Sequence, residues 1–237
     1  MNTEIRLSSN PKSRFSEAIK TIRTNLAFSS IDKELKVILI TSPEAGDGKS
    51  YISANLAVAY AQEGKKVLLI DADLRKGRLH DIYGIPNPIN AGYSNLILRY
   101  VDEMNIHRYI LPTSHKNVFI IPTGPKPPNP IELLDSENNA KFIEKAKQYF
   151  DIIILDCTPV IGLSDALVMT KFSDVNIIVV SNKKTKFENL ERTKKLFDQA
   201  NKKINGVVIN KAQTKQNSYY SYYTNDDYYL KKENNNV

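Results

Sequence analysis

Short apolar runs alternate with amphipathic segments along most of the chain. Continuous runs of Val, Ile and Leu predict buried strands, at about residues 36–41, 66–70, 117–121, 151–156, 175–180 and 204–209. Helical spacing of apolar residues predicts helices between them, at about residues 16–28, 51–64, 131–134, 139–149, 164–169 and 187–200, with a shorter one within 87–100. Strands that are apolar on both faces are typical of a parallel sheet covered by helices. We therefore expect an α/β fold, a three-layer αβα sandwich around a mostly parallel sheet.

A glycine-rich segment directly follows the first strand. It reads Ser-Pro-Glu-Ala-Gly-Asp-Gly-Lys-Ser over residues 42–50, and a helical pattern comes after it. Glycines allow successive N–H groups to converge, and a helix N-terminus adds partial positive charge, so this arrangement cradles phosphate. Lys49 is placed to bridge the outer phosphates, and Ser50 to hold Mg²⁺. The segment predicts a P-loop NTPase-like fold that binds ATP through Gly46, Asp47, Gly48, Lys49, Ser50 and Tyr51.

One position departs from the strict phosphate-loop pattern, which has a glycine where this chain has Pro43. The alternative interpretation is a helix cap with incidental glycines. We favour the phosphate loop because strand, loop and helix occur in the required order.

Carboxylates end two of the predicted strands. Asp71 and Asp73 follow the second strand and Asp156 ends the fourth. Because ligands bind at the carboxyl ends of parallel strands, these side chains are candidates for the same site. Mg²⁺ prefers one or two protein oxygens besides phosphate, which Ser50 and Asp156 can supply. Asp71 or Asp73 would then accept or orient the proton of an attacking hydroxyl, although either could instead cap the next helix. The candidate catalytic residues are Lys49, Asp71, Asp73 and Asp156.

The composition narrows the class of protein. The 237 residues suit one α/β domain with tails, and the formal net charge is +7. This charge is not gathered in one long block, so we expect a solvated surface and no nucleic-acid partner. No apolar stretch approaches the roughly 20 residues that span a bilayer, and the N-terminus lacks an apolar signal region. With a single cysteine, Cys157, the chain is expected to be cytoplasmic.

The two ends differ from the central part. We expect a flexible N-terminal segment over residues 1–15, a P-loop ATP-binding domain over 16–211, and a flexible tail over 212–237. The tail lacks apolar periodicity but contains a cluster of tyrosines between positions 219 and 229. A flexible segment of this kind can deliver a hydroxyl to a phosphate in line with its leaving group.

These motifs together resemble the bacterial tyrosine kinases of capsular and exopolysaccharide synthesis, of the separate cytoplasmic type found in Gram-positive bacteria. The resemblance runs from about residue 16 to the tyrosine tail. It rests on five segments: 41–50, similar to the family's Walker A, which also lacks the first glycine; 69–75, similar to its Walker A′; 124–134, a characteristic loop; 152–159, similar to its Walker B; and 207–211, a strand end.

The resemblance implies an ATP- and Mg²⁺-dependent protein-tyrosine kinase that phosphorylates a neighbouring copy of itself. The implied targets are Tyr219, Tyr220, Tyr222, Tyr223, Tyr228 and Tyr229. Asn210 is implied to contact adenine. Glu17, Lys20 and Arg23 match a Glu-x-x-Arg-x-x-Arg helix used in ring oligomerisation, with Lys20 departing from it. A separate transmembrane activator, or polysaccharide copolymerase, is implied to recruit the kinase to the inner face of the membrane.

Two other functions remain open at this level. A partition or septum-positioning ATPase shares the predicted fold. The phosphate loop of such ATPases, however, has Lys at the position that Glu44 holds here, and they lack a tyrosine cluster. The chain could also be a non-catalytic, ATP-dependent regulatory subunit of a polysaccharide export machine.

Overall fold

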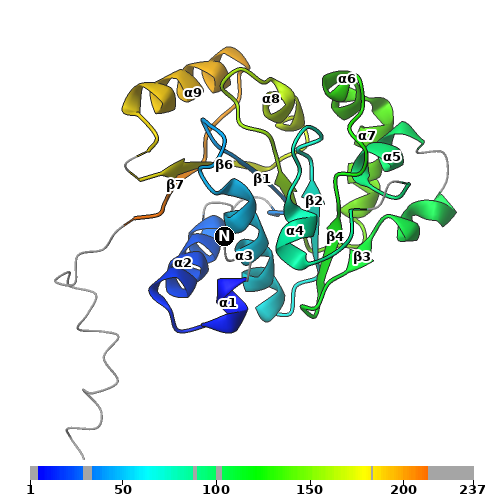
Figure 1. The fold of residues 1–237 in the computed structure, drawn as a ribbon, viewed down its shortest axis with the longest axis horizontal. Helices are drawn as coiled ribbons and strands as arrows, with labels where there is room; N and C mark the ends of the chain where they lie inside the picture. The colour runs from blue at the N-terminus through cyan, green and yellow to red at the C-terminus, as the bar shows by residue number, and fades with distance from the viewer. Residues whose placement is uncertain (1–4, 29–33, 88–89, 100–102, 183, 213–237) are drawn as a thin grey trace, which may run out of the picture.

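The computed structural model describes residues 5–28, 34–87, 90–99, 103–182 and 184–212. Its centre is a seven-stranded sheet with the order β3-β4-β2-β5-β1-β6-β7 (Figure 1). All neighbouring strands run parallel except β3, which is antiparallel to β4. The expected fold, a mostly parallel sheet in an α/β sandwich, is confirmed.

The strands lie close to where the apolar runs predict them. Their bounds are β1 Val37–Thr41, β2 Val67–Asp71, β3 Leu111–Pro112, β4 Val118–Ile121, β5 Ile152–Asp156, β6 Val175–Ser181 and β7 Gly206–Asn210. Every residue of β1, β2, β5 and β6 is buried, which is why these strands read as continuous apolar runs.

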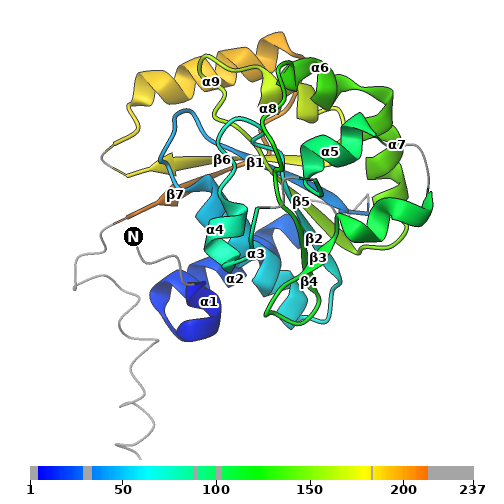
Figure 2. The same ribbon diagram turned by 45° about the vertical axis from the view of Figure 1, so that its right-hand side comes forward.

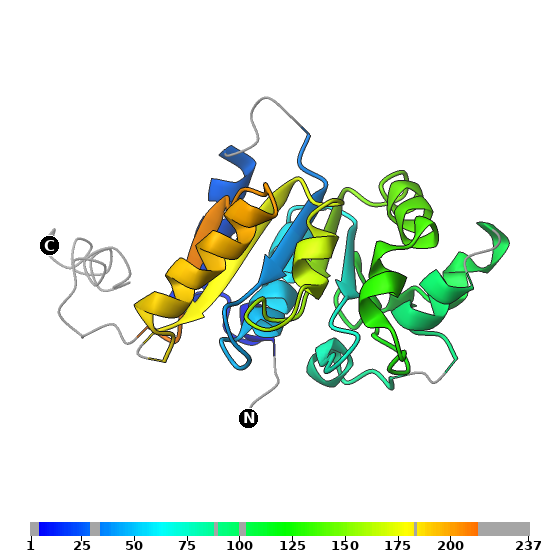
Figure 3. The ribbon, with the colours of Figure 1, turned by 90° about the horizontal axis from the view of Figure 1, so that it is seen from above.

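Helices cover both faces of the sheet. Their bounds are α1 Arg6–Ser9, α2 Arg14–Phe28, α3 Lys49–Gln62, α4 Leu79–Tyr83, α5 Tyr93–Leu98, the 3₁₀ helix η1 Glu103–Arg108, α6 Pro130–Asp135, α7 Glu137–Ala146, α8 Asp165–Met169 and α9 Phe187–Gln199. Helices α1–α4 pack on one face and α5–α9 on the other (Figures 1 and 2). Seen from above, α7, α8 and α9 lie side by side across the second face (Figure 3).

Successive side chains along each buried strand point alternately toward these two helix layers. In β5, Ile152 and Ile154 join the core beneath α1–α4, whereas Ile153 and Leu155 join the core beneath α5–α9. This period of two divides each buried strand between two hydrophobic cores. Among the described residues, no helix is long and apolar enough to cross a membrane.

The N-terminal segment differs from the expectation of a flexible stretch over residues 1–15. Residues 6–9 form α1, and Ile5 and Leu7 are buried in the core beneath α2 and α3. The backbone N–H of Leu7 donates to Asn55 Oδ1 of α3 at 3.0 Å. A buried hydrogen bond to a distant side chain therefore fixes a segment whose own sequence is mostly polar.

Other short elements were absent from the sequence prediction. Strand β3 has only two residues and includes Pro112, and α4 has five residues. The short helix expected within 87–100 is present as α5, at Tyr93–Leu98. The tyrosine cluster of the tail lies outside the described residues.

The topology brings several strand ends to one edge of the sheet. Asp71 at the end of β2 pairs in register with Asp156 at the end of β5. Ile40 of β1, just before the phosphate loop, also pairs with Asp156. The order β2-β5-β1 therefore places both carboxylates beside the loop at the carboxyl edge, where parallel sheets bind ligands.

Candidate active site

The phosphate loop, residues 42–50, connects β1 to α3 and depends on two glycines. Gly46 and Gly48 have φ angles of 87° and 98°, in the left-handed region that other residues rarely adopt. A Cβ on Gly48 would lie 2.1 Å from Asn210 Nδ2, so this close approach also requires glycine. Helix α3 then begins at Lys49 and directs its N-terminus at the loop.

Residues at the end of β7 and in the segments after β6 and β7 form hydrogen bonds to the backbone and side chains of this loop. Lys184 Nζ donates to the Ala45 carbonyl at 2.7 Å, and Lys211 Nζ donates to the Gly46 carbonyl at 2.8 Å. We call Lys184, Thr185, Asn210 and Lys211 the clamp residues. Two lysines thereby fix consecutive carbonyls of the loop.

The other clamp residues contact Asp47, which is fully buried. Thr185 Oγ1 donates to Asp47 Oδ1 at 3.0 Å, and Asn210 Nδ2 donates to the Asp47 carbonyl at 2.9 Å. Asp47 Oδ2 accepts the backbone N–H of Glu44 at 3.2 Å. Both carboxylate oxygens of Asp47 are thus used to shape the loop.

Lys49 lies among the three predicted carboxylates. Its Nζ is 3.4 Å from Asp73 Oδ2, and its side chain is mostly buried. Burial alone would lower the pKa of Lys49, but Asp156, Asp73 and Asp71 together raise it above the usual value. The ammonium is therefore charged at neutral pH and can interact with phosphate.

Asp156 is fully buried at the end of β5. Its Oδ1 accepts a hydrogen bond from Ser53 Oγ at 3.2 Å, and Oδ2 has no hydrogen-bond partner among the described residues. Burial raises the pKa of Asp156 to about 6, while Lys49 and the hydroxyls of Ser50 and Ser53 offset part of that effect. Within the described part of the chain, one buried oxygen of this carboxylate is therefore left without a hydrogen-bond partner.

Asp71 is also fully buried, and one of its two carboxylate oxygens accepts a hydrogen bond. Its Oδ2 accepts the N–H of Leu79, the first residue of α4, at 3.0 Å, whereas Oδ1 has no partner within the described structure. Burial, and next the charge of Asp156, hold the pKa of Asp71 well above its usual range. Of the two aspartates considered as caps, it is Asp71 that bonds to the start of the next helix.

Asp73 shapes the turn after β2. Its Oδ1 accepts the N–H groups of Arg75 and Lys76 at 3.2 and 2.8 Å, and its Oδ2 faces Lys49. Arg75 Nε in turn contacts both carboxylate oxygens of the buried Asp165 at 3.1 Å. The turn is therefore held from both sides, with one oxygen of Asp73 directed at the site.

These residues fit a magnesium ion that arrives with ATP. Asp156 Oδ2 is buried without a partner, which is costly unless a cation or donor satisfies it. Ser50 and Ser53 place hydroxyls beside the same carboxylate. No group of three or more His, Cys, Asp or Glu among the described residues forms a metal site of its own. Mg²⁺ bound partly through phosphate needs fewer protein ligands than that.

The remaining predicted site residues lie elsewhere or are already engaged. The Tyr51 ring packs against Phe15 of α2, with ring centroids 5.3 Å apart. Asn210 uses its amide on the loop, as above, and its Oδ1 accepts the N–H of Lys211 at 2.8 Å. These contacts do not test the adenine role that the resemblance implies for Asn210.

The proposed oligomerisation residues make contacts within the chain. Lys20 Nζ pairs with Glu17 at 2.7 Å. Arg23 donates to the Ala59 carbonyl of α3 at 2.9 Å and pairs with Glu63 at 2.5 Å. Contacts between copies through this helix remain a prediction.

Sequence reasoning missed several residues of the site. Ser53 follows Ser50 by three positions, so both hydroxyls lie on one side of α3, a signal that helical spacing could have given. Lys184 and Thr185 come three and four residues after the end of β6, and Lys211 directly follows β7, so the rule that located Asp71 at a strand end could have found them. Asp165 gave no comparable signal, because it reaches Arg75 only through the tertiary fold.

Comparisons with known proteins agree with this architecture. A family model described as an AAA domain matches residues 35–209. The tyrosine-protein kinase YwqD of Bacillus subtilis (strain 168) is 36% identical over 94% of this chain and 92% of its own length. The putative tyrosine-protein kinase CapB of Staphylococcus aureus is 37% identical over 92% of this chain and 93% of its own length.

Solved structures give the same picture. The crystal structure of the chimerical protein CapA2B2 matches with a TM-score of 0.83 and 34% identity, covering 90% of this chain and 92% of that one. The septum site-determining protein MinD of Pyrococcus horikoshii OT3, complexed with Mg-ADP, matches with a TM-score of 0.62 and 23% identity, covering 76% of this chain and 72% of that one. At that identity the likeness to MinD concerns the fold alone.

The likeness to the tyrosine kinases is nearly complete in both directions, and more than a third of the aligned residues are identical. The AAA-domain match spans the whole phosphate loop and the strand ends that carry the three aspartates. The chain therefore carries an AAA domain and belongs to the bacterial tyrosine kinases.

Proposed function

We propose that this protein is an ATP- and Mg²⁺-dependent tyrosine kinase that phosphorylates the C-terminal tyrosine cluster of a neighbouring copy. The observation that carries the proposal is the position of Lys49. Its ammonium lies beside a glycine loop and among three carboxylates, two of which keep an oxygen without a partner among the described residues. Such a site suits a polyphosphate with its metal ion.

Each residue of the site has a distinct task in this scheme. Lys49 and the loop N–H groups bind and orient the phosphates, which positions the transferred group in line with an incoming hydroxyl. Ser50 and Asp156 would hold Mg²⁺, which neutralises charge on the phosphates when bound. Asp71 or Asp73 accepts the proton of the tyrosine hydroxyl.

The first experiment tests transfer itself. The full chain is incubated with Mg-ATP, as parent and as Lys49→Met, and residues 212–237 are examined by mass spectrometry. We expect several phosphotyrosines in the parent and almost none in the variant. Nucleotide binding is followed in parallel with a fluorescent ATP analogue. A parent that binds ATP but carries no phosphate on the tail would contradict the proposal.

The second experiment tests whether transfer occurs between copies. A chain that lacks residues 213–237 keeps the site but has no targets, and Lys49→Met keeps the targets but lacks the key cation. Neither should become phosphorylated alone. Mixed with Mg-ATP, the pair is expected to phosphorylate the tail of the Lys49→Met chain. Phosphorylation in the parent but not in the mixture would show transfer within one copy.

The cellular role follows from the family resemblance. We propose that the kinase regulates capsular or exopolysaccharide synthesis, that a separate transmembrane activator recruits it to the inner face of the membrane, and that no nucleic acid takes part. Phe in place of all six tail tyrosines, with Lys49 intact, provides the test. Unchanged polymer output in a strain carrying this variant would mean that phosphorylation is not the signal.

A further inference from the structure

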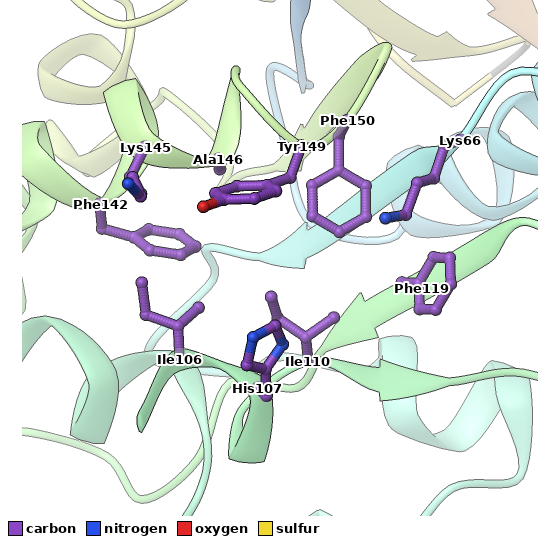
Figure 4. A pocket seen from close by; sticks show the side chains of 10 residues that line it. All are labelled: Lys66, Ile106, His107, Ile110, Phe119, Phe142, Lys145, Ala146, Tyr149 and Phe150. Atoms are coloured by element: carbon purple, nitrogen blue, oxygen red, sulfur yellow. The ribbon is translucent and has the colours of Figure 1, made fainter. Parts of the chain in front are cut away.

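A cavity of about 170 Å³ lies between η1 and α7 (Figure 4). It borders Lys66, directly before β2, and Phe119 near the start of β4. The phosphate loop lies at the opposite end of the sheet, beside Asp71 at the end of β2. This η1–α7 pocket is therefore separate from the kinase site.

The walls of the pocket are apolar and belong to the core. Phe142, Ala146 and Phe150 form one side and are buried, while Ile106 and Ile110 face them from the other side in Figure 4. A cavity of about 150 Å³ lined by similar side chains holds benzene in another protein. The size and lining thus suit one aromatic ring or a short hydrocarbon chain.

Two lysines stand at the ends of this apolar slot (Figure 4). Lys66 Nζ lies over the rings of Phe150 and Phe119, 4.9 and 5.5 Å from their centroids. Lys145 Nζ lies 5.5 Å from the centroid of Tyr149. The two ring faces attract the Lys66 cation without accepting conventional hydrogen bonds from its N–H donors.

Lys66 has no carboxylate partner within the described part of the chain. Asp151 is close in space, but its Oδ2 accepts the backbone N–H of Lys66 at 2.7 Å, and the ion pairs of the described residues do not include Lys66. An ammonium beside an apolar cavity favours a ligand that brings an anion on an apolar body.

We propose that the η1–α7 pocket binds a small amphipathic carboxylate, with its apolar body between η1 and α7 and its carboxylate on Lys66. The bound molecule would occupy the end of β2 and β4 opposite to ATP. Binding at this pocket does not depend on the proposed kinase activity.

Hexanoate is a suitable probe, with 1-hexanol and hexylammonium as neutral and cationic controls of the same length. Each is titrated into the ¹⁵N-labelled full chain and followed by amide chemical shifts. We expect saturable shifts confined to η1, α7 and the start of β4, with hexanoate the tightest binder and hexylammonium the weakest. Phosphate-loop amides should not shift.

Matched variants test the role of the charges. Lys66→Gln is expected to weaken hexanoate binding about threefold, since exposed ion pairs contribute modestly. Lys171→Gln is the control, because Lys171 also lies over a ring, that of Phe172 at 4.8 Å, but away from this pocket. Hexylammonium binding as tightly as hexanoate, unchanged hexanoate affinity in Lys66→Gln, or no saturable shifts at these elements would overturn the proposal.

Discussion

At the scale of single residues, the two clamp lysines shape the phosphate loop without belonging to its motif. Lys184 and Lys211 each donate to a loop carbonyl from outside, so both hold the backbone of the loop that is expected to bind phosphate. Their contribution is therefore to the binding of nucleotide more than to the transfer step.

We expect Lys184→Ala and Lys211→Ala each to raise the KM for ATP about threefold to tenfold, with a smaller change in kcat, because each variant loses a charge-assisted hydrogen bond at an exposed position. Steady-state kinetics measure both constants. Arg in place of either lysine keeps the donor and should restore much of the affinity. Equal losses in kcat and kcat/KM would instead point to contact with the transferred phosphate.

The buried carboxylates also determine how stability depends on pH. Burial raises the pKa of Asp156 from 3.8 to about 6, so the native protein keeps a proton that the unfolded chain releases between these values. This group stabilises the fold fully below its unfolded pKa, and the effect is lost as pH rises through about 6. A shift of that size corresponds to about 3 kcal/mol.

Without nucleotide or Mg²⁺, Asp156→Asn should therefore raise the free energy of unfolding at pH 7.5 by about 1–3 kcal/mol. The gain should shrink as pH falls toward 4. Urea unfolding at several pH values measures this, with Asp81→Asn, an exposed aspartate, as the control. The same variant should lose kinase activity. A variant less stable than the parent at pH 7.5 would contradict the assigned burial cost.

At the scale of elements, α1 provides the sharpest test of the fold. Leu7 is fully buried beneath α2 and α3, while its neighbour Arg6 is exposed. We expect Leu7→Ala to lower the free energy of unfolding by about 2–4 kcal/mol, since it removes a buried side chain and leaves a cavity. Arg6→Ala should change it by less than about 0.5 kcal/mol. Denaturant unfolding distinguishes the two, and equal effects would mean that α1 is loosely held.

The elements that the sequence predicted well are those with a strong local signal. Buried parallel strands such as β5 and β6 are continuous apolar runs, so their positions follow from the sequence within a residue or two. Helix α1 has too few residues for a helical period, and its place depends on Asn55, far along the chain. Strand β3 contains Pro112, which argues against a strand except at a sheet edge, where it lies.

The contacts of the candidate site likewise fall into those that the sequence predicted and those that it did not. Motif residues such as Lys49 and Asp156 were predictable because loop spacing and strand ends place them. The bond from Thr185 to Asp47 and that from Arg75 to Asp165 join segments far apart in sequence, which no local pattern encodes. Predicting them requires knowing that β6 lies next to β1 and how the later helices pack.

At the scale of the whole molecule, charge links the proposed chemistry to assembly. The chain carries a net charge of +7, and each phosphate adds about −1.5 to −2 at pH 7. Full phosphorylation of six tyrosines would therefore reverse the sign of the molecule. A tail that has become anionic should bind differently to the lysine-rich edge around the phosphate loop of another copy.

We expect the oligomeric mass, measured by light scattering, to differ between the unphosphorylated parent and the protein after incubation with Mg-ATP. The variant with Phe in place of the six tail tyrosines is the matched control and should keep its mass under both conditions. If the parent keeps its mass despite full phosphorylation, charge on the tail does not govern assembly.

The clamp has a mechanical consequence because of where it lies along the chain. Lys211, which adopts a left-handed backbone conformation with φ of 57°, is separated from residue 213 by Ala212 alone. Tension on the C-terminal end would thus reach Gly46 through a single side chain. Capture of that end by another copy is therefore expected to loosen the grip on nucleotide in the chain that supplies the tail, so that a chain serving as substrate releases its own nucleotide more readily.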